Sequence, residues 1–396
     1  MTPGSIHEIH EERLDDASRA LLARVREQLP LLREEAPKSE AARAPTDRAI
    51  EALASTGVFS MMVPKSYGGL ELDLDAFLAV GLTLGEADVS LAWITTFYIE
   101  HNWMLCQFPA KFQEQLYEDR SYVLAPAIIA PTGSAEQCNG GWRLSGRWRF
   151  GTGIVHGDWV ILGGLTPETG GLRFFAMPKS DVEVVDTWHV DGMRGTGSHD
   201  VVVEDRLIPE ERSIDFGTSV LGQGLGAELH AGPLYRTPMI PILAMAASMP
   251  IVGQSRAIVR DHVGHVKEKS RMGVGPKVMD KSATQVRIAR TELGRRQIEL
   301  AMHDVVGRVM ARRDAASPED RAMATTTLCL SVHQARELIA EIAVTGGASA
   351  HYEPHPLQRA LRDVHMATSH VVFDRDAQLE NLGRLRLGLE PTSFLY

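Results

Sequence analysis

Apolar side chains between residues 14 and 115 recur at intervals of three and four, which is the spacing of one face of a helix. Thr46 and Asp47 provide a cap for one of the predicted helices, and Gly57 ends it. Residues 58–69 interrupt the pattern with turn-forming residues. The clearest apolar stripe consists of Leu21, Leu22, Val25, Leu29 and Leu32.

A further helix is predicted from residue 88 to residue 107, and it is unusually aromatic. His101 and Asn102 lie within it. Aromatic residues at helical spacing usually belong to a core, and a histidine among them is usually a hydrogen-bonded core residue. The alternative is the wall of an aromatic substrate pocket with His101 as its polar group. The aromatic residues are Trp93, Phe97, Tyr98, Trp103 and Phe108.

The pattern changes to strict alternation between Trp142 and Phe150, which predicts a strand with one apolar face. A turn signal, residues 139–141 (Asn-Gly-Gly), precedes it. Residues 151–153 (Gly-Thr-Gly) end it with small side chains, which allow a flat ligand to approach the backbone while Thr152 offers a hydroxyl. A plain surface hairpin is the competing interpretation. Trp142, Leu144, Trp148 and Phe150 share one face, and Arg143, Ser145, Arg147 and Arg149 share the other.

Short apolar or alternating runs continue to about residue 212, with Gly, Pro or Asp between them. Such regular spacing predicts a small β-barrel or sandwich. Residues 192–198 form a second glycine-rich connection. Residues 213–233 resemble a loop and do not form a dinucleotide-binding fingerprint, so no nicotinamide site is expected. The expected strands are 155–162, 172–177, 182–188 and 201–207.

Helical patterning returns at about residue 238 and continues to the C-terminus. Arg271 and Gly273 lie in a predicted break between two long helices. Ser317 and Pro318 begin another helix, which ends near residues 346–347. A final helix is expected to carry Arg362, Asp363, His365 and His370. The predicted domains are a helical domain (1–120), a β domain (121–215) and a helical bundle domain (216–396).

Composition narrows the possible functions. The 396 residues carry a net charge of −10, whereas a general nucleic-acid-binding protein is normally basic. The three cysteines fit no metal motif, and an odd number argues against a disulfide framework, so reduced thiols and a cytoplasmic location are expected. Residues 1–12 contain no apolar signal region. No apolar run is expected to be long enough to cross a bilayer.

The order of helices, strands and long helices resembles the acyl-CoA dehydrogenase superfamily. Residues 63–69 (Val-Pro-Lys-Ser-Tyr-Gly-Gly) are similar to its Pro-x-x-Tyr-Gly-Gly segment, and residues 144–153 to its flavin-facing strand. Residues 192–205 resemble its Gly-x-Arg-Gly closing strand. Residues 346–363 resemble the segment before its active-site helix. The resemblance therefore implies an α+β fold with an N-terminal helical domain, a middle β-barrel and a C-terminal four-helix bundle.

One departure points to a particular branch. The catalytic glutamate of the dehydrogenases falls at or next to Val371, which cannot act as a base, and the nearest acid downstream is Asp374. His370 together with residues 101–103 (His-Asn-Trp) and 146–150 (Gly-Arg-Trp-Arg-Phe) resembles the group D flavin-dependent monooxygenases. These include the oxygenase components of 4-hydroxyphenylacetate hydroxylase and of secosteroid phenol hydroxylase.

This resemblance implies an aromatic hydroxylase that uses O2 and reduced FAD or FMN supplied by a separate flavin reductase, through a C4a-hydroperoxyflavin. His370 would be the general base, His101 would orient the substrate, and Thr152 would contact the flavin N5. Trp93, Phe97 and Tyr98 would line the substrate pocket. The resemblance also implies a homotetramer. The remaining cofactor contacts would be Phe150, Gly151, Arg271, Gly346, Gly347 and Ser349, and arginine suits a phosphate.

The substrate stays open at the level of sequence. Residues 126–129 (Pro-Ala-Ile-Ile) stand where related phenol hydroxylases carry serines, so phenolic, indolic and polycyclic rings all remain candidates. An N-oxygenase acting on an amine or amino sugar is the main alternative. An acyl-CoA dehydrogenase, which lacks its carboxylate here, and a flavin-binding protein without turnover are further alternatives.

Overall fold

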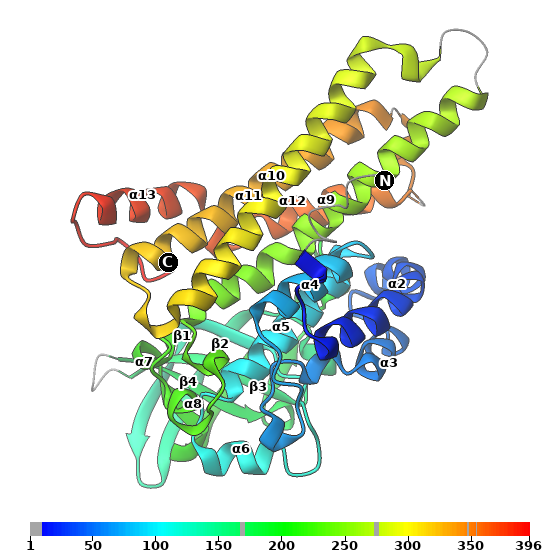
Figure 1. Ribbon diagram of the computed structural model, residues 1–396. Helices are drawn as coiled ribbons and strands as arrows, with labels where there is room; N and C mark the ends of the chain where they lie inside the picture. Colours follow the sequence, from blue (N-terminus) through cyan, green and yellow to red (C-terminus); the bar gives the residue numbers. More distant parts are fainter. Residues whose placement is uncertain (1–9, 167–170, 273–276, 347, 354) are drawn as a thin grey trace.

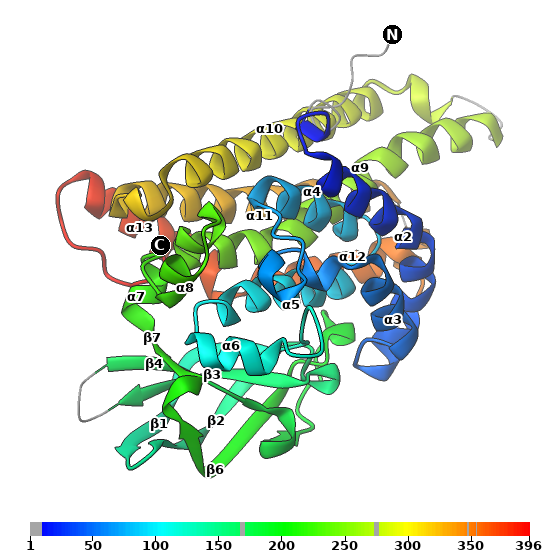
Figure 2. The same cartoon turned by 60° about the horizontal axis from the view of Figure 1, so that its bottom comes forward.

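The computed structural model describes residues 10–166, 171–272, 277–346, 348–353 and 355–396. Helical regions come before and after a mixed β-sheet in the described sequence (Figure 1). In Figure 2 the sheet lies at one end of the molecule, and the long C-terminal helices cross the opposite end. Helix α5 lies between these two layers. The predicted sequence of helical, β and helical regions is confirmed, whereas the exact domain boundaries stay a prediction.

The N-terminal helices follow the apolar pattern of the sequence. All five residues of the predicted leucine and valine stripe are buried. The hydroxyl of Thr46 accepts the amide N–H of Ala49, and Gly57 ends the helix with φ 81°, so both predicted helix signals are confirmed. The elements are α2 (Asp16–Ala42), α3 (Asp47–Thr56), η1 (Val58–Ser60), η2 (Lys65–Tyr67), α4 (Leu74–Gly85), α5 (Val89–Leu105) and α6 (Ala110–Leu116).

Helix α5 is buried along its whole length, which explains why it is apolar and aromatic on all sides. It packs against α4 and the long helix α9 (Met239–Met272). The hydroxyl of Thr96 donates to the carbonyl oxygen of Ala246 at 2.8 Å and fixes the two helices together.

The strands form an open sheet of seven strands in the order β5-β6-β2-β1-β3-β4-β7. Strands β1 and β3 are parallel, and every other neighbouring pair is antiparallel. The predicted closed barrel is therefore wrong, because the short strands β5 and β7 lie at opposite edges and do not pair. The strands are β1 (Ala127–Cys138), β2 (Gly141–Gly151), β3 (Trp159–Thr166), β4 (Gly171–Pro178), β5 (Glu183–Val185), β6 (His199–Pro209) and β7 (Ser213–Asp215).

Some strand boundaries also differ from the prediction. The run beginning at Val155 starts as a 3-10 turn, η3 (Ile154–His156), so its strand begins only at Trp159. Residues 213–233, predicted as a loop, contain β7 and the short elements α7 (Phe216–Val220), α8 (Leu225–Leu229) and η7 (Pro233–Arg236). These elements are only a few residues long, so periodicity could not reveal them.

Three long C-terminal helices pack side by side: α9, α10 (Ser282–Arg312) and α11 (Pro318–Gly346). Helix α12 (Pro356–Ala367) contacts α9 and α11, and α13 (Arg375–Arg386) contacts α11. The predicted placement of His370 on the final helix is wrong. Helix α12 ends at Ala367, and His370 lies at the N-cap of the 3-10 turn η11 (Val371–Phe373).

Helix α9 corrects the expectation about membrane-spanning length. An 18-residue window within Met239–Glu268 has a mean hydropathy of 1.4, enough by length and composition to cross a bilayer. In this fold, however, 94% of that window is buried inside the protein, as in the core helix of a globular domain. The apolar surface of α9 packs against α4, α5 and α11. Its hydropathy is therefore weak evidence for a membrane-spanning helix.

Candidate active site between the sheet and the C-terminal helices

A cavity of about 550 Å³ lies where α5, the ends of β1 and β2, and the segment around η11 meet. Its lining is largely apolar and aromatic, as in sites for small molecules. Of the predicted site residues, it brings together Trp93, Phe97, His101, Phe150, Thr152 and His370. The other lining residues are Ala127, Ile128, Ile129, Ala130, Arg149, Trp188, Met193, Thr196, Ser198, Leu243, Met366, Ala367, Ser369, Val371, Val372 and Leu395.

The glycine turn after β2 forms one wall of the cavity. The pairing of β2 with β6 is irregular between Trp148 and Gly151. Phe150 takes a positive φ of 70° there, and 63% of its surface is exposed. The alternation that placed Phe150 with the buried face is therefore wrong at this position. Its ring instead meets Trp188 edge to face, 6.2 Å between centroids.

Helix α5 holds this turn from behind. Gly153 has φ 74°, and a Cβ added to it would lie 2.5 Å from the hydroxyl oxygen of Tyr98. That hydroxyl donates to the carbonyl oxygen of Gly153 at 2.5 Å. Only glycine permits this approach. Tyr98, predicted to line the substrate pocket, supports the turn and is absent from the described cavity lining.

Three hydroxyls form a chain beside the turn. The side-chain oxygens of Thr152 and Ser198 lie 3.1 Å apart, and those of Ser198 and Thr196 lie 2.7 Å apart. Thr196 also bonds to the carbonyl oxygen of Met193 at 2.8 Å. Ser198 and Thr196 were not among the predicted site residues, although the glycine-rich connection containing them was a signal. The chain fixes the Thr152 hydroxyl at the cavity wall.

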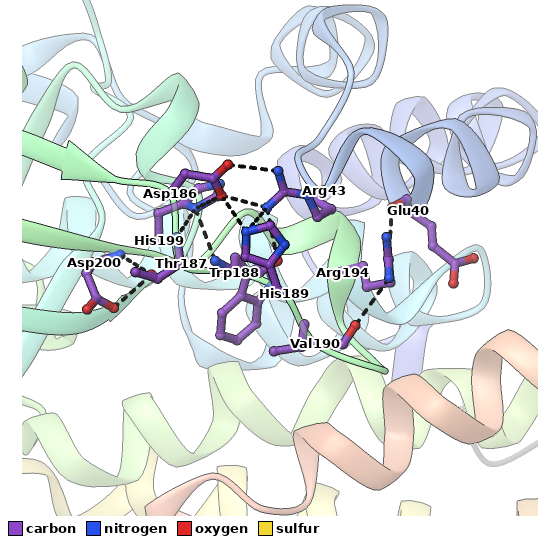
Figure 3. Close-up of polar contacts among 10 residues, drawn as sticks. All are labelled: Glu40, Arg43, Asp186, Thr187, Trp188, His189, Val190, Arg194, His199 and Asp200. Carbon is purple, nitrogen blue, oxygen red and sulfur yellow. Dashed lines mark hydrogen bonds and ion pairs between the residues drawn. The ribbon is translucent and has the colours of Figure 1, made fainter.

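The connection from β5 to β6 is tied to the N-terminal helices (Figure 3). Arg43 binds both carboxylate oxygens of Asp186, at 2.6 and 2.9 Å, and these hydrogen bonds lower the pKa of Asp186 to about 2. Nδ1 of His199 accepts the amide N–H groups of Thr187 and Trp188 at 3.2 and 3.3 Å. Together these contacts hold the Trp188 segment against Phe150.

The other end of this connection is tied to α12. Asp363 accepts the amide N–H of Met193 at 2.6 Å. A Cβ on Gly192 would lie only 2.2 Å from the carbonyl oxygen of Arg362, so glycine is required there. Burial, and next the charge of Asp88, raise the pKa of Asp363 to about 8. The C-terminal helices thereby position the same segment that supplies Thr196 and Ser198.

His370 faces the cavity from η11. Its ring lies 5.6 Å from that of Trp93 and 6.3 Å from that of Phe97, centroid to centroid. Desolvation lowers its pKa to about 4, so the ring is neutral near pH 7. Nδ1 accepts the amide N–H of Val372 at 3.3 Å, which places the ring proton on Nε2.

His101 is neutral for the same reason, because burial lowers its pKa to about 3. Its Nδ1 lies 2.7 Å from the carbonyl oxygen of Ala125, which can only accept, so Nδ1 carries the proton. The neighbouring Asn102 binds the backbone N–H and carbonyl of Val123, at 3.1 and 2.8 Å. His101 is thus a hydrogen-bonded core residue that also lines the cavity, and its contact with a substrate stays a prediction.

Comparison with known proteins agrees with this geometry. Residues 11–116 match the acyl-CoA dehydrogenase N-terminal domain, and residues 245–375 match the acyl-CoA dehydrogenase C-terminal domain. The chain is 30% identical over 380 residues to a pigment production hydroxylase of Rhodococcus sp. (strain ATCC 21145), covering 95% of this chain and 98% of that protein. It is 30% identical over 374 residues to the flavin-dependent monooxygenase oxygenase subunit HsaA of Rhodococcus jostii (strain RHA1), covering 92% and 97%. The chain belongs to the oxygenase components of the flavin-dependent monooxygenases, within the acyl-CoA dehydrogenase superfamily.

A solved structure of the same family extends the comparison to the fold. XiaF from Streptomyces sp., in complex with FADH2 and glycerol, superimposes with a TM-score of 0.87 at 26% identity. The match covers 95% of this chain and 97% of that chain.

The described residues of this oxygenase fit a flavin. Gly151 and Gly153 let the turn pack closely against the His199 carbonyl and the Tyr98 hydroxyl, and Thr152 between them offers a fixed hydroxyl to the cavity. Phe150 and Trp188 supply aromatic surface on the same side of the cavity. Arg149 is exposed at this wall and carries a positive charge.

Gly151, also predicted to contact the cofactor, is not among the described lining residues of this cavity. Arg271 lies in the last turn of α9 and Gly346 at the end of α11, while Ser349 lies in η10 (Ala348–His351). The side chains of Arg271 and Ser349 lie outside the described part of the chain, as does all of Gly347. Their contact with a flavin stays a prediction.

The hydrogen bond between Tyr98 and Gly153 generates a stability prediction. Tyr98→Phe leaves the Gly153 carbonyl without this donor and is expected to lower the free energy of unfolding by about 1–3 kcal/mol. It should also weaken FMN binding, because the turn loses its support. Urea denaturation and fluorescence titration with FMN measure the two effects.

Tyr235→Phe is a matched control, because Tyr235 is also fully buried and donates to the Met62 carbonyl at 3.2 Å away from the cavity. It should lower stability while leaving FMN affinity unchanged. Equal losses of FMN affinity in both variants would contradict the placement of the flavin at this turn.

Proposed function

We propose that this chain is the oxygenase component of a two-component monooxygenase that hydroxylates an aromatic substrate, phenolic, indolic or polycyclic. It would use O2 and reduced FAD or FMN from a separate flavin reductase. The observation that carries the proposal is the single cavity joining a glycine turn with a fixed Thr152 hydroxyl to a wall of Trp93, Phe97, His101 and His370.

The flavin half of the cavity is assigned to the glycine turn. Reduced flavin, when bound, supplies the electrons that activate O2. The chain contributes the Thr152 hydroxyl, which we assign to the flavin N5 and which Ser198 orients. Phe150 and Gly151 flank the ring, and the apolar residues around them exclude the water that would promote peroxide release.

The substrate half is assigned to α5 and η11. Neutral His370 carries its proton on Nε2 and holds a substrate oxygen by donating to it. For the general-base role the ring proton moves to Nδ1, which breaks the 3.3 Å contact with the Val372 amide, and Nε2 then takes the substrate proton to give an imidazolium. His101, protonated on Nδ1, is an uncharged ring beside Phe97, and we assign it the orientation of the substrate through packing.

The competing functions fit this cavity less well. None of its described lining residues is an aspartate or glutamate, so the carboxylate base of an acyl-CoA dehydrogenase is missing from the described site. The aromatic wall favours a ring over the amino sugar of an N-oxygenase. A flavin-binding protein without turnover would have no use for His370 beside Trp93 and Phe97.

Assembly into a homotetramer through a bundle of C-terminal helices is part of the proposal. Val286, Leu293 and Leu300 recur every seven residues on one side of α10 and are 62%, 61% and 49% exposed. Such an apolar stripe is typical of a helix covered by another subunit. We also infer a cytoplasmic location, the domain boundaries given above, and a flavin site that a neighbouring subunit completes with Arg271, Gly346, Gly347 and Ser349.

The dependence on a reductase is tested with the purified chain. We expect no oxidation of NADH or NADPH by the chain alone, and hydroxylation of phenols or indoles once a flavin reductase, FMN or FAD, and O2 are supplied. Product formation is followed by mass spectrometry. Nicotinamide oxidation by the chain alone would contradict the two-component assignment.

Thr152 is expected to control coupling between flavin oxidation and hydroxylation. Thr152→Ala removes one hydrogen bond worth roughly 1 kcal/mol, which corresponds to about a fivefold faster loss of peroxide. The ratio of hydrogen peroxide released to product formed measures this. Thr152→Ser keeps the hydroxyl and should stay near the original ratio. An unchanged ratio in Thr152→Ala would place the flavin N5 elsewhere.

His370 is expected to act on the substrate. His370→Ala should slow oxygen transfer by about 10²–10⁴-fold, the usual contribution of a positioned acid or base, while flavin affinity stays near normal. Rapid-mixing measurements with reduced flavin and O2 follow product formation. His365→Ala is the matched control, since His365 is exposed on α12. A normal rate in His370→Ala would make the histidine structural and shift the base to His101.

The α10 stripe is tested by light scattering. We expect the unaltered chain to be a tetramer and Leu293→Glu to dissociate it, because a charge would be buried at the interface. Leu387→Glu, at a 78% exposed position after α13, should leave assembly unchanged. A stable monomer that binds flavin normally would overturn the shared flavin site.

A further inference from the structure

A buried carboxyl group lies beside the cavity and has no place in the proposed mechanism. Glu100 is 1% exposed and His101 is 2% exposed. Oε2 of Glu100 lies 3.2 Å from Nε2 of His101. Neither carboxyl oxygen of Glu100 has a hydrogen-bond partner among the described residues. A buried glutamate in this setting needs a physical account.

The hydrogen bond made by Nδ1 of His101 determines whether Nε2 of the same ring carries a proton. Nδ1 of His101 donates to the Ala125 carbonyl at 2.7 Å, so in the neutral ring Nε2 has no proton. A carboxylate oxygen 3.2 Å from an unprotonated nitrogen would bring two lone pairs together. A proton must therefore reside on Glu100 or on Nε2.

Burial selects the uncharged arrangement. A carboxylate without hydrogen-bond donors is very costly to bury, and so is an imidazolium. Desolvation raises the pKa of Glu100 to about 8 and lowers that of His101 to about 3. Apart from burial and the His101–Ala125 hydrogen bond, no other group contributes to either shift, and the nearby His370 is itself neutral.

We propose that Glu100 is a positioning residue held as a carboxylic acid, and that the Glu100–His101 pair keeps the inner end of the cavity free of charge so that the site takes uncharged aromatic rings. The inference rests on the proposed function for the identity of the cavity. Among the described lining residues Arg149 alone is charged, and it lies exposed at the flavin wall.

This pair has a consequence for substrate choice. Because the Glu100 proton is directed at Nε2 of His101, the pair presents neither a charge nor a free donor to an aromatic carboxylate. Such an anion would also be desolvated without a cation to pair with it at this end of the cavity. The pair therefore selects against aromatic acids.

Infrared difference spectroscopy at pH 7 tests the protonation state without substrate or turnover. The carbonyl stretch of a protonated acid should be present in the unaltered protein and lost in Glu100→Gln. Asp363→Asn is the matched control, because Asp363 is a second buried acid whose pKa is raised to about 8, and its loss should leave the Glu100 band in place. No difference between the unaltered protein and Glu100→Gln would show that Glu100 is ionised and overturn the proposal.

Binding of 2-naphthol and 2-naphthoate, followed by tryptophan fluorescence, tests the selectivity. We expect 2-naphthol to bind about tenfold or more tightly, since desolvating an unpaired anion costs more than 1.4 kcal/mol. Glu100→Gln should preserve the ratio, because it replaces one uncharged group by another. A gain of about tenfold for 2-naphthoate in Glu100→Gln would mean that a negative charge had been removed, and would overturn the proposal. Failure of both probes to bind, with the infrared result intact, would count against the aromatic function instead.

Discussion

The close approach of α5 to the end of β2 is the constraint on which the site depends. Gly153 has no room for a side chain because the Tyr98 hydroxyl lies against it, and that hydroxyl satisfies the Gly153 carbonyl. The same helix carries Trp93, Phe97 and His101 into the cavity. One buried helix therefore shapes the proposed flavin wall from behind and the proposed substrate wall directly, which links the two halves of the chemistry.

A second constraint is the way the segment between β5 and β6 is held. Arg43 from the N-terminal helices binds Asp186, and Asp363 from α12 binds the amide of Met193. Thr196 and Ser198 lie within the same segment, so their hydroxyls are fixed by contacts that span all three parts of the fold. Small residues within it, such as Gly192, allow the close contact with α12.

The absence of charge around His101 and His370 is a third organising feature of the described cavity. Burial keeps His101 and His370 neutral and raises the pKa of Glu100. Their tautomers follow from backbone contacts, Ala125 for His101 and Val372 for His370. The two histidines consequently offer opposite groups, an acceptor and a donor, although both are neutral imidazoles. The acceptor of His101 faces the Glu100 carboxyl, so the donor of His370 is the group left for a substrate.

The sequence alone determined the regular elements and the family. Apolar spacing identified α2, capping residues identified α3, and alternation with flanking glycines located β2 and its turn, because these signals are local. Motifs in order along the chain placed it in its superfamily, and His370 together with residues 101–103 and 146–150 indicated the branch. Tertiary structure decided the rest. Whether the sheet closes depends on which strands pair at its edges, and the exposure of Phe150 depends on a bulge against β6. His370 lies outside the helix because α12 ends at Ala367. The role proposed for Glu100 depends on its distance from His101. Such facts arise from contacts between residues far apart in the chain or from side-chain direction, neither of which periodicity records.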